Sequence, residues 1–501
     1  MMDRQFQFEK MLWLGAAMGA VVFFALLLAV DNILLTLASG AFLWMATIPY
    51  HARLSVMISA VTFNSALAIP IAGQPLVWEV ASVMGWSGMI VLLFLRQYSP
   101  DFREQLHQRR FILLGAVGYV LVLLVMMRLR GVGLLVFGSE NVGGRVYLQQ
   151  LSCAIFPVLF LAVPIGAKLL KRLFVLQCLL SITFLISDLV LATGSSGPLW
   201  MVLNFMTLSN DSLFFESQSQ FQGLRRFQSF AIVAQAGCFL ILTRYGLNEL
   251  FSGRRPLMLV LLAALGVVGL IGGHRALLVI LTMTVLLMAW GERFYSPGRV
   301  AFGGFFATFL LVGAYTFGES LPLAAQRSLS ILPGMRTAAI AADDAQSTFD
   351  GRLLMRRVGW EVAPNYLLLG RGFGMNPNVV ESPEFDPFET IKAHLQVGRF
   401  YNGFIGLLVN TGLPGLFFMS MFLFGISRIA WKLLVHLRVH GCDDTLGRLC
   451  ALLAANWLAN VVFFYVAHGD SEFAMRTFGL QSGLLMVASK LRIQQFEAGA
   501  A

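Results

Sequence analysis

The sequence has little charge. Only 12% of its 501 residues are Asp, Glu, Lys or Arg, against about 25% in ordinary soluble domains. The apolar share is 57% and the mean hydropathy is +0.75. This composition excludes a coiled coil, a disordered protein and a soluble enzyme with a small anchor. It predicts an integral membrane protein, most of which lies in the bilayer.

Cysteine and the common motifs of soluble enzymes are also scarce. The five cysteines lie in apolar stretches or in a loop that we expect in the cytoplasm, and they indicate no disulfide framework. The sequence has no Walker loop, no Cys-rich or His-rich metal spacing and no Gly-x-Ser-x-Gly elbow. The acidic pair Asp443-Asp444 is interpreted as a solvated loop. We therefore expect no cofactor and no metal.

What the sequence does contain is a series of apolar runs. Apolar stretches of about 15 residues or more with few charges, each close to the length of a spanning helix, give fourteen candidate spans: 11–30, 32–50, 54–73, 80–95, 111–127, 146–167, 173–194, 228–243, 257–273, 276–290, 300–318, 400–427, 446–467 and 473–490. The span 80–95 is short and the two spans within 257–290 are almost continuous. The sequence thus predicts an all-α, polytopic transmembrane bundle of about 12–14 spans.

The net charge of +10 comes from basic residues scattered between these runs. This pattern is typical of cytoplasmic loops under the positive-inside rule and does not indicate nucleic-acid binding. The basic connections are 96–110, 168–172, 244–255 and 428–448. They orient the chain with both termini in the cytoplasm. The loop 128–145 has three arginines and goes against the rule.

Two connections are much longer than helix packing needs. One covers about 195–228, and the other covers about 80 residues, 319–399, with 8 basic and 9 acidic side chains. Because long loops in compact proteins are usually functional or disordered, and this one has amphipathic patches, we expect an ordered extracytoplasmic cap. The predicted divisions are an N-terminal bundle (1–194), central spans with the first outer loop (195–318), the large periplasmic loop (319–399) and C-terminal spans (400–501).

Arginines concentrate at the predicted outer boundary of the membrane. Guanidinium groups are always charged and bind phosphate oxygens in pairs of hydrogen bonds. Arg275 lies inside an apolar stretch with few alternatives to a functional role. We expect a pyrophosphate-binding site formed by Arg225, Arg226, Arg275 and Arg399.

The large loop holds candidates for proton transfer and charge stabilisation. Arg352, Arg356 and Trp360 recur every four residues and would share one helical face. His394 and Tyr401 would lie on one face if the segment leading into the next span is helical, and a histidine can accept a proton near neutral pH. An acidic patch around 381–389 is interpreted as a solvated loop, although a carboxylate base there stays an alternative. The candidate catalytic residues are His394, Tyr401 and Arg352.

Several short motifs follow one another in and around the large loop. They are Gly351-Arg352, Trp360, Pro364, Gly370-x-Gly372-x-Gly374, Tyr401-Asn402-Gly403-Phe404 and Gly412-Leu413-Pro414-Gly415, preceded by Arg226-x10-Gly237 and Gly273-His274-Arg275-Ala276-Leu277-Leu278. Over roughly residues 190–490, this pattern resembles the O-antigen ligase and O-antigen polymerase superfamily of bacterial inner-membrane glycosyltransferases. In that family a histidine commonly stands where this chain has Tyr401, which favours the polymerase over the ligase.

The resemblance implies a GT-C-like membrane fold and a metal-independent, inverting transfer at the outer leaflet. The donor would be a glycan on undecaprenyl pyrophosphate. The acceptor would be another glycan, as in O-antigen or exopolysaccharide polymerases, or the lipid A core, as in a ligase. A chain-length regulator protein would be a possible partner. A lipid-linked oligosaccharide flippase, a peptidoglycan polymerase of the shape-elongation-division type and a non-catalytic membrane scaffold are the alternatives.

Overall fold

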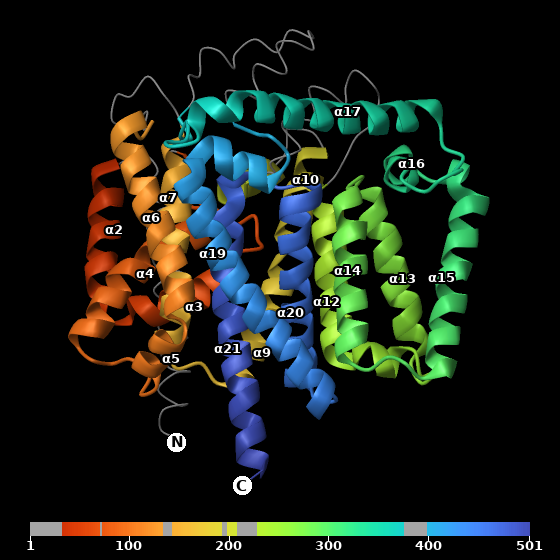
Figure 1. Cartoon of the computed structure of the whole chain (residues 1–501), viewed down its shortest axis with the longest axis horizontal. Helices are drawn as coiled ribbons and strands as arrows, with labels where there is room; N and C mark the ends of the chain where they lie inside the picture. The colour runs from red at the N-terminus through yellow and green to blue at the C-terminus, as the bar shows by residue number, and fades with distance from the viewer. Residues whose placement is uncertain are drawn as a thin grey trace.

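The computed structural model describes residues 33–70, 73–133, 143–192, 198–207, 228–374 and 398–500. Within these ranges the chain is helical, with two isolated β-bridges and no strand (Figure 1). Eight stretches are long and apolar enough to cross a membrane, and α13 and α14 are shorter apolar helices. The predicted all-α, polytopic helix bundle is confirmed. The number of 12–14 spans stays a prediction, because the candidate span 11–30 lies outside the described residues.

The helices of the first half are α2 (Ile33–Thr47), α3 (His51–Thr62), α4 (Val77–Phe94), α5 (Phe102–Gln108), α6 (Arg110–Arg130), α7 (Gly144–Cys153), α8 (Phe156–Ala162), α9 (Ala167–Leu180) and α10 (Ile182–Ala192). Those of the second half are α12 (Gln228–Leu250), α13 (Pro256–Ile271), α14 (Arg275–Gly291), α15 (Pro297–Phe317), α16 (Leu323–Leu329), α17 (Ala339–Val362), α19 (Gly403–His440), α20 (Thr445–Val462) and α21 (Ala474–Ala500).

One predicted span is wrong. The stretch 54–73 does not form a single crossing, because α3 ends at Thr62 after 12 residues, a rise of only about 18 Å. Beyond it the backbone is irregular, and the N–H of Ala66 donates to Thr183 Oγ1 at 2.8 Å.

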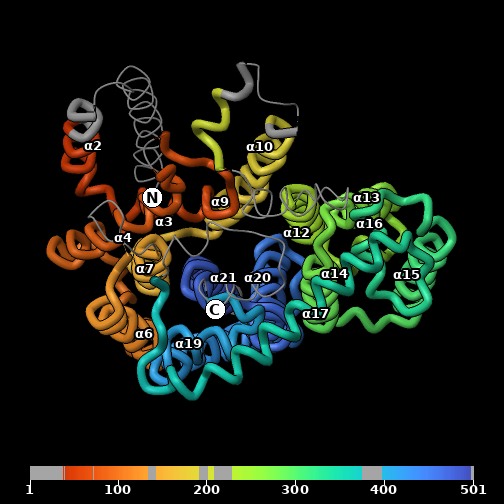
Figure 2. The backbone as a smooth tube through the Cα atoms, turned by 90° about the horizontal axis from the view of Figure 1, so that it is seen from above, coloured from red at the N-terminus to blue at the C-terminus, as the bar shows by residue number. Residues whose placement is uncertain are grey.

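The segment after α15 forms a cap over one end of the bundle. In Figure 1 the long helix α17 lies across the tops of the membrane helices, and Figure 2 shows it running from the group α13 to α16 toward α19. It packs against α16 at one end and α19 at the other. Residues 319–374 are largely helical and lie over this end of the bundle, whereas the predicted extracytoplasmic location of the cap stays a prediction. Residues 375–397 lie outside the described residues.

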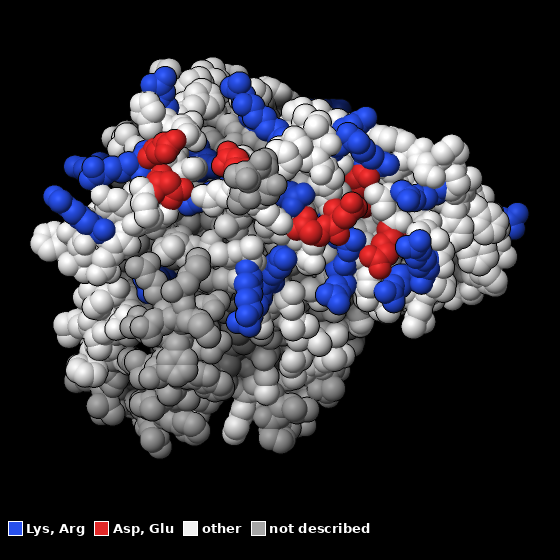
Figure 3. Space-filling view, turned by 90° about the horizontal axis from the view of Figure 1, so that it is seen from below, with Lys and Arg blue, Asp and Glu red and all other residues white. Residues whose placement is uncertain are grey.

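Basic connections meet at the opposite end of the bundle, which Figure 3 shows as a face dotted with Lys, Arg and carboxylates. Arg448 forms an ion pair of 3.4 Å with Glu249 and donates to the carbonyl of Arg244. Lys490 pairs with Asp101, and in a separate contact Arg492 pairs with Asp444 at 2.6 Å. These contacts bring the predicted cytoplasmic connections near 96–110, 244–255 and 428–448 to one end. The sidedness itself stays a prediction.

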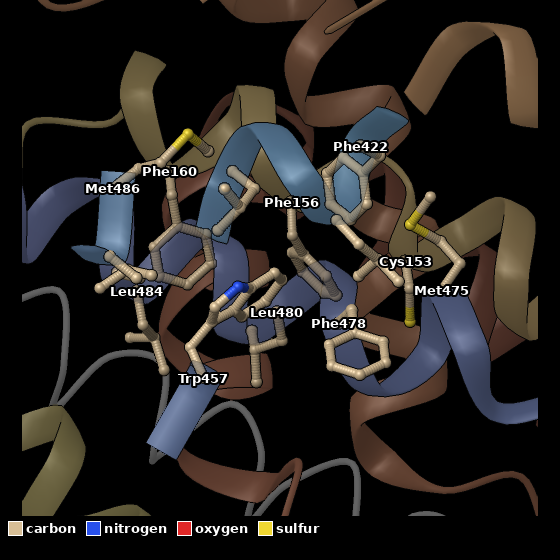
Figure 4. Packing of buried hydrophobic residues seen from close by; sticks show 14 of the residues in the cluster. Cys153, Phe156, Phe160, Phe422, Trp457, Met475, Phe478, Leu480, Leu484 and Met486 are labelled. Atoms are coloured by element: carbon tan, nitrogen blue, oxygen red, sulfur yellow. The ribbon is translucent and has the colours of Figure 1, made fainter. Parts of the chain in front are cut away.

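The core forms where α21 packs against α7 and α8 (Figure 4). Gly479 and Gly483 make this approach possible, because a Cβ on Gly479 would lie 2.5 Å from the Cys153 carbonyl oxygen and one on Gly483 would lie 2.7 Å from the Phe160 ring. Small residues four apart let membrane helices pack closely. Trp457 of α20 meets Phe478 edge to face, with ring centroids 5.2 Å apart.

A break in α19 fixes the far end of the cap. Gly412 has φ +72°, and Pro414 has no N–H to donate to the carbonyl four residues earlier. The freed carbonyls of Val409 and Asn410 accept from the N–H groups of Arg371 and Gly372 at 2.9 and 3.0 Å. The glycine-rich turn 370–374 therefore docks into the broken helix through backbone hydrogen bonds.

This docking predicts a sharp difference between two glycines of the same turn. A Cβ on Gly370 would lie 2.3 Å from the backbone of Asn410, whereas a Cβ on Gly374 would meet nothing within 4 Å. We expect Gly370→Ala to destabilise the protein by about 1–3 kcal/mol, as overpacking does, and Gly374→Ala to leave it unchanged. Thermal unfolding of the two variants in the same detergent checks this. Equal melting curves would contradict the docking.

Candidate functional site

A group of arginines lies beneath α17, where separate parts of the chain meet. Arg275 begins α14, Arg352 and Arg356 come from α17, and the charges of Arg352 and Arg327 both reach Arg275. Arg352, Arg356 and Arg399 all act electrostatically on His468. We call this group the arginine cluster, and its members are Arg275, Arg327, Arg352, Arg356 and Arg399.

Arg327 ties the cap to the membrane helices. It is buried together with Asp344 of α17, and the two side chains form an ion pair. Its guanidinium also donates from Nη1 to the carbonyl of Gly273 at 2.6 Å and from Nη2 to Thr348 Oγ1 at 3.1 Å. Arg327 therefore holds α16, α17 and the turn between α13 and α14 in one arrangement.

Arg275 stands next to this anchor without a similar set of partners. Its Nε and Nη2 atoms are buried, and they have no hydrogen-bond partner among the described residues. The neighbouring charges of Arg327 and Arg352 repel it, and Asp344, which attracts it, is already paired with Arg327. Because a buried and unsatisfied guanidinium is costly, this arrangement favours an anion as ligand.

The inner side of α17 contributes two more guanidinium groups. Arg352 lies over the ring of Tyr401, with 5.6 Å between its Cζ atom and the ring centroid. Arg356 donates to the carbonyl oxygens of Tyr401, at 3.2 Å, and Ala467. Trp360, one turn further along α17, packs on Phe404 and is 54% exposed. Burial lowers the pKa of both arginines, and both keep their charge.

Tyr401 has a strained backbone. Its φ of +52° lies in the left-handed region that favours glycine, and such strain in other residues gathers at functional sites. The conformation is held on both sides, because its N–H donates to Asp470 Oδ1 at 3.3 Å and its carbonyl accepts from Arg356. The next residue, Asn402, caps α19 through its side chain. Tyr401 is therefore placed by its backbone contacts.

His468 is the residue that the sequence did not single out. It follows a short π-helix (Phe463–Ala467) at the end of α20, a feature frequent at functional sites. Its ring is nearly parallel to that of Tyr401, with an interplanar angle of 19° and centroids 5.4 Å apart. Its Nδ1 atom is buried without a hydrogen-bond partner in the described parts of the chain. Gly403 lets the π-helix pack closely against the start of α19, because a Cβ at Gly403 would lie 2.3 Å from the Phe464 ring.

The electrostatics of the site follow from burial and from the arginines. Burial, together with the charges of Arg352 and Arg356, lowers the pKa of His468 to about 3. Burial and the neighbouring Glu472 raise the pKa of Asp470 to about 6. Perturbed values of this kind are typical of functional sites. At neutral pH the imidazole is neutral and the Asp470 carboxyl is mostly ionised.

Arg399, like Arg327, is already neutralised by a carboxylate. Its Nε and Nη2 atoms lie 3.0 and 2.8 Å from Glu472 Oε1. The predicted role of Arg399 as a ligand of pyrophosphate is therefore less direct than that of Arg275. Its contact joins the segment before α19 to the turn before α21.

The structure brings four of the predicted site residues together, namely Arg275, Arg352, Arg399 and Tyr401. Arg225, Arg226 and His394 lie outside the described residues. The sequence did not identify Arg327 or His468 as site residues. The signal for His468 was its place in the polar turn 468–472 between two apolar spans, because ionisable groups at the edge of a membrane span are often functional.

The buried ion pair generates a prediction for the cap. We expect Arg327→Ala to destabilise the protein by about 3–5 kcal/mol, because Asp344 would be left buried and unpaired. The matched control is Arg255→Ala, which breaks an exposed pair of 3.3 Å with Glu249 and should change stability by less than about 1 kcal/mol. Thermal unfolding of both variants makes the comparison. An equally small effect of the two substitutions would contradict the anchoring role.

Comparisons with known proteins add no family to this picture. No protein-family model matches the chain. No curated protein matches its sequence. The functional argument therefore rests on the residues of the site.

Proposed function

We propose that this protein is a membrane glycosyltransferase that moves a glycan from a polyprenyl pyrophosphate to a glycan acceptor, in the manner of an O-antigen or exopolysaccharide polymerase. The observation that carries the proposal is the half-buried guanidinium of Arg275, whose Nε and Nη2 atoms are buried without partners in the described residues. It lies among other arginines at one end of an apolar bundle. A lipid diphosphate has both the charge and the membrane-bound tail that this position requires.

The charge balance supports a diphosphate over a neutral ligand. The five arginines of the cluster face three carboxylates, Asp344, Asp470 and Glu472, among the described residues. This leaves an excess of two positive charges. A diphosphate ester carries a similar number of negative charges, and guanidinium groups bind its oxygens in pairs.

The chemistry of the transfer also suits the site. The acceptor hydroxyl attacks the anomeric carbon, and the bond from that carbon to the diphosphate oxygen breaks, with inversion. Negative charge then develops on the leaving diphosphate. Fixed donors in a partly dry site stabilise such charge without having to reorient, which is the role that we assign to Arg275 and Arg352. Tyr401 lies under the guanidinium of Arg352, and we place the acceptor beside it.

The proposal includes the sidedness and the location of the protein. The basic face opposite α17 would lie in the cytoplasm under the positive-inside rule. The cap and the arginine cluster would then lie at the outer leaflet of a bacterial inner membrane. A ligase using the lipid A core would use the same donor site, and the choice of acceptor separates it from a polymerase.

The first test is binding of farnesyl pyrophosphate to the full chain in lipid nanodiscs. We expect Arg275→Ala to weaken binding about 10- to 100-fold, the range for a lost hydrogen bond to a charged group. Arg275→Lys should recover part of the affinity, because it keeps the charge but not the planar fork. Arg255→Ala on the opposite face is the control.

The second readout is transfer in detergent with lipid-linked oligosaccharides from the source membrane. Detergent provides no two compartments, so a flippase would bind the diphosphate without lengthening the glycan. Binding by the wild type without any transfer would replace the enzyme by a transporter. Unchanged binding in Arg275→Ala would remove the arginine cluster from donor recognition.

A further inference from the structure

His468 lies partly buried beside the arginine cluster, unlike a histidine exposed to solvent. Its ring stacks on Tyr401, one ring nitrogen is buried without a partner in the described chain, and arginines from two other segments act on it. The groups that act on it are Arg352 and Arg356 of α17, His274 before α14, and Arg399 and Tyr401 before α19. Asp470, two residues further along its own turn, accepts from the N–H of Tyr401. The π-helix that carries it presents the ring to this group.

We propose that His468 accepts the proton of the acceptor hydroxyl, and that the donor diphosphate activates it by neutralising the arginines around it. This inference deepens the proposed function and rests on it. It assigns the proton to a residue from the turn between α20 and α21, whereas the candidates from the sequence were His394, Tyr401 and a carboxylate around 381–389.

The activation follows from the charges around His468. Without a ligand, burial and the neighbouring arginines keep the pKa of His468 at about 3, so the imidazole is a weak base. A diphosphate bound to Arg275 and Arg352 places negative charge beside the ring and cancels the field of the guanidinium groups. An opposite charge within about 4–6 Å favours the protonated form. A bound diphosphate therefore raises the proton affinity of His468.

The transfer step balances with this assignment. The acceptor oxygen forms its bond to the anomeric carbon while the bond from that carbon to the diphosphate breaks. The electron pair of the broken bond leaves on the diphosphate. The proton of the acceptor hydroxyl moves to the neutral imidazole of His468, and the imidazolium then releases it to the departing diphosphate or to water. No oxidant, metal or other co-reactant is needed.

Two neighbouring groups are less suited to this role. Tyr401 is a phenol, which ordinarily gives up its proton only near pH 10, so its ring serves better as a surface for His468 and Arg352. Asp470 is occupied by the N–H of Tyr401 and helps to hold the strained backbone. We therefore treat Asp470 as a positioning residue.

Proton uptake on binding is the test that isolates His468. A group whose pKa rises on binding takes up a proton, so the affinity for farnesyl pyrophosphate increases as the pH falls. The diphosphate and Asp470 titrate as well, but they do so in the wild type and in His468→Gln alike. The difference between the two proteins reports His468. We expect the wild type to gain about tenfold more affinity than His468→Gln between pH 7.5 and 5.

Transfer measurements complete the experiment. We expect His468→Gln to bind farnesyl pyrophosphate at pH 7.5 within about threefold of the wild type and to lose transfer about 100-fold or more, the contribution of a general base. His468→Asn is the second variant, in case glutamine disturbs the fold, and thermal unfolding checks both. His440→Gln, at the other end of α19, is the matched control and should behave as the wild type.

The outcomes separate the inference from the function on which it rests. Transfer within about tenfold of the wild type in His468→Gln, or an unchanged pH dependence of binding, would overturn the role of His468 while leaving the enzyme in place. Equal loss of binding and transfer in both His468 variants would also overturn it, since that would indicate a contact with the donor. A wild type that neither binds farnesyl pyrophosphate nor transfers glycan would overturn the proposed function itself.

Discussion

The arginine cluster beneath α17 is the feature on which the rest of the site depends. Arg275 begins a membrane helix with guanidinium nitrogens that no described residue satisfies, and like charges surround it. Proteins rarely keep such an arrangement without a ligand, because a desolvated and unpaired charge is expensive. The two arginines that do have carboxylate partners, Arg327 and Arg399, hold the walls of the site together. Arg275, Arg352 and Arg356 form no ion pair with a carboxylate among the described residues.

The fold maintains this arrangement by fastening α17 at both ends. At one end Arg327 joins α16 and α17 to the turn before α14. At the other end the glycine-rich turn after α17 donates its backbone N–H groups to the carbonyls that Gly412 and Pro414 release in α19. The strained backbone of Tyr401 and the π-helix before His468 lie between these anchors. Parts of the chain distant in sequence thus converge on one volume.

The sequence predicts the helical membrane bundle, because composition and apolar periodicity are local properties. The structure brings Arg275 and Arg352 close together, and their predicted role stays a prediction. The sequence does not predict that α3 stops at Thr62, since the ending depends on contacts with Thr183 and with the segment at Phe205. For His468 the sequence offers only the polar turn 468–472 as a signal, and Arg327 could not be identified from it, because their partners lie far away in the sequence. The glycine motifs at Gly370 and Gly412 can be seen in the sequence. The structure shows that they allow the turn after α17 to form backbone hydrogen bonds with the broken helix α19.

The most direct measurement is an experimental structure of the full chain in nanodiscs with farnesyl pyrophosphate. We expect density for the diphosphate between Arg275 and Arg352, with His468 beside it and the isoprenoid chain leading into the bilayer. Density for the diphosphate elsewhere, with Arg275 paired to a carboxylate of the chain, would show that Arg275 does not bind the donor.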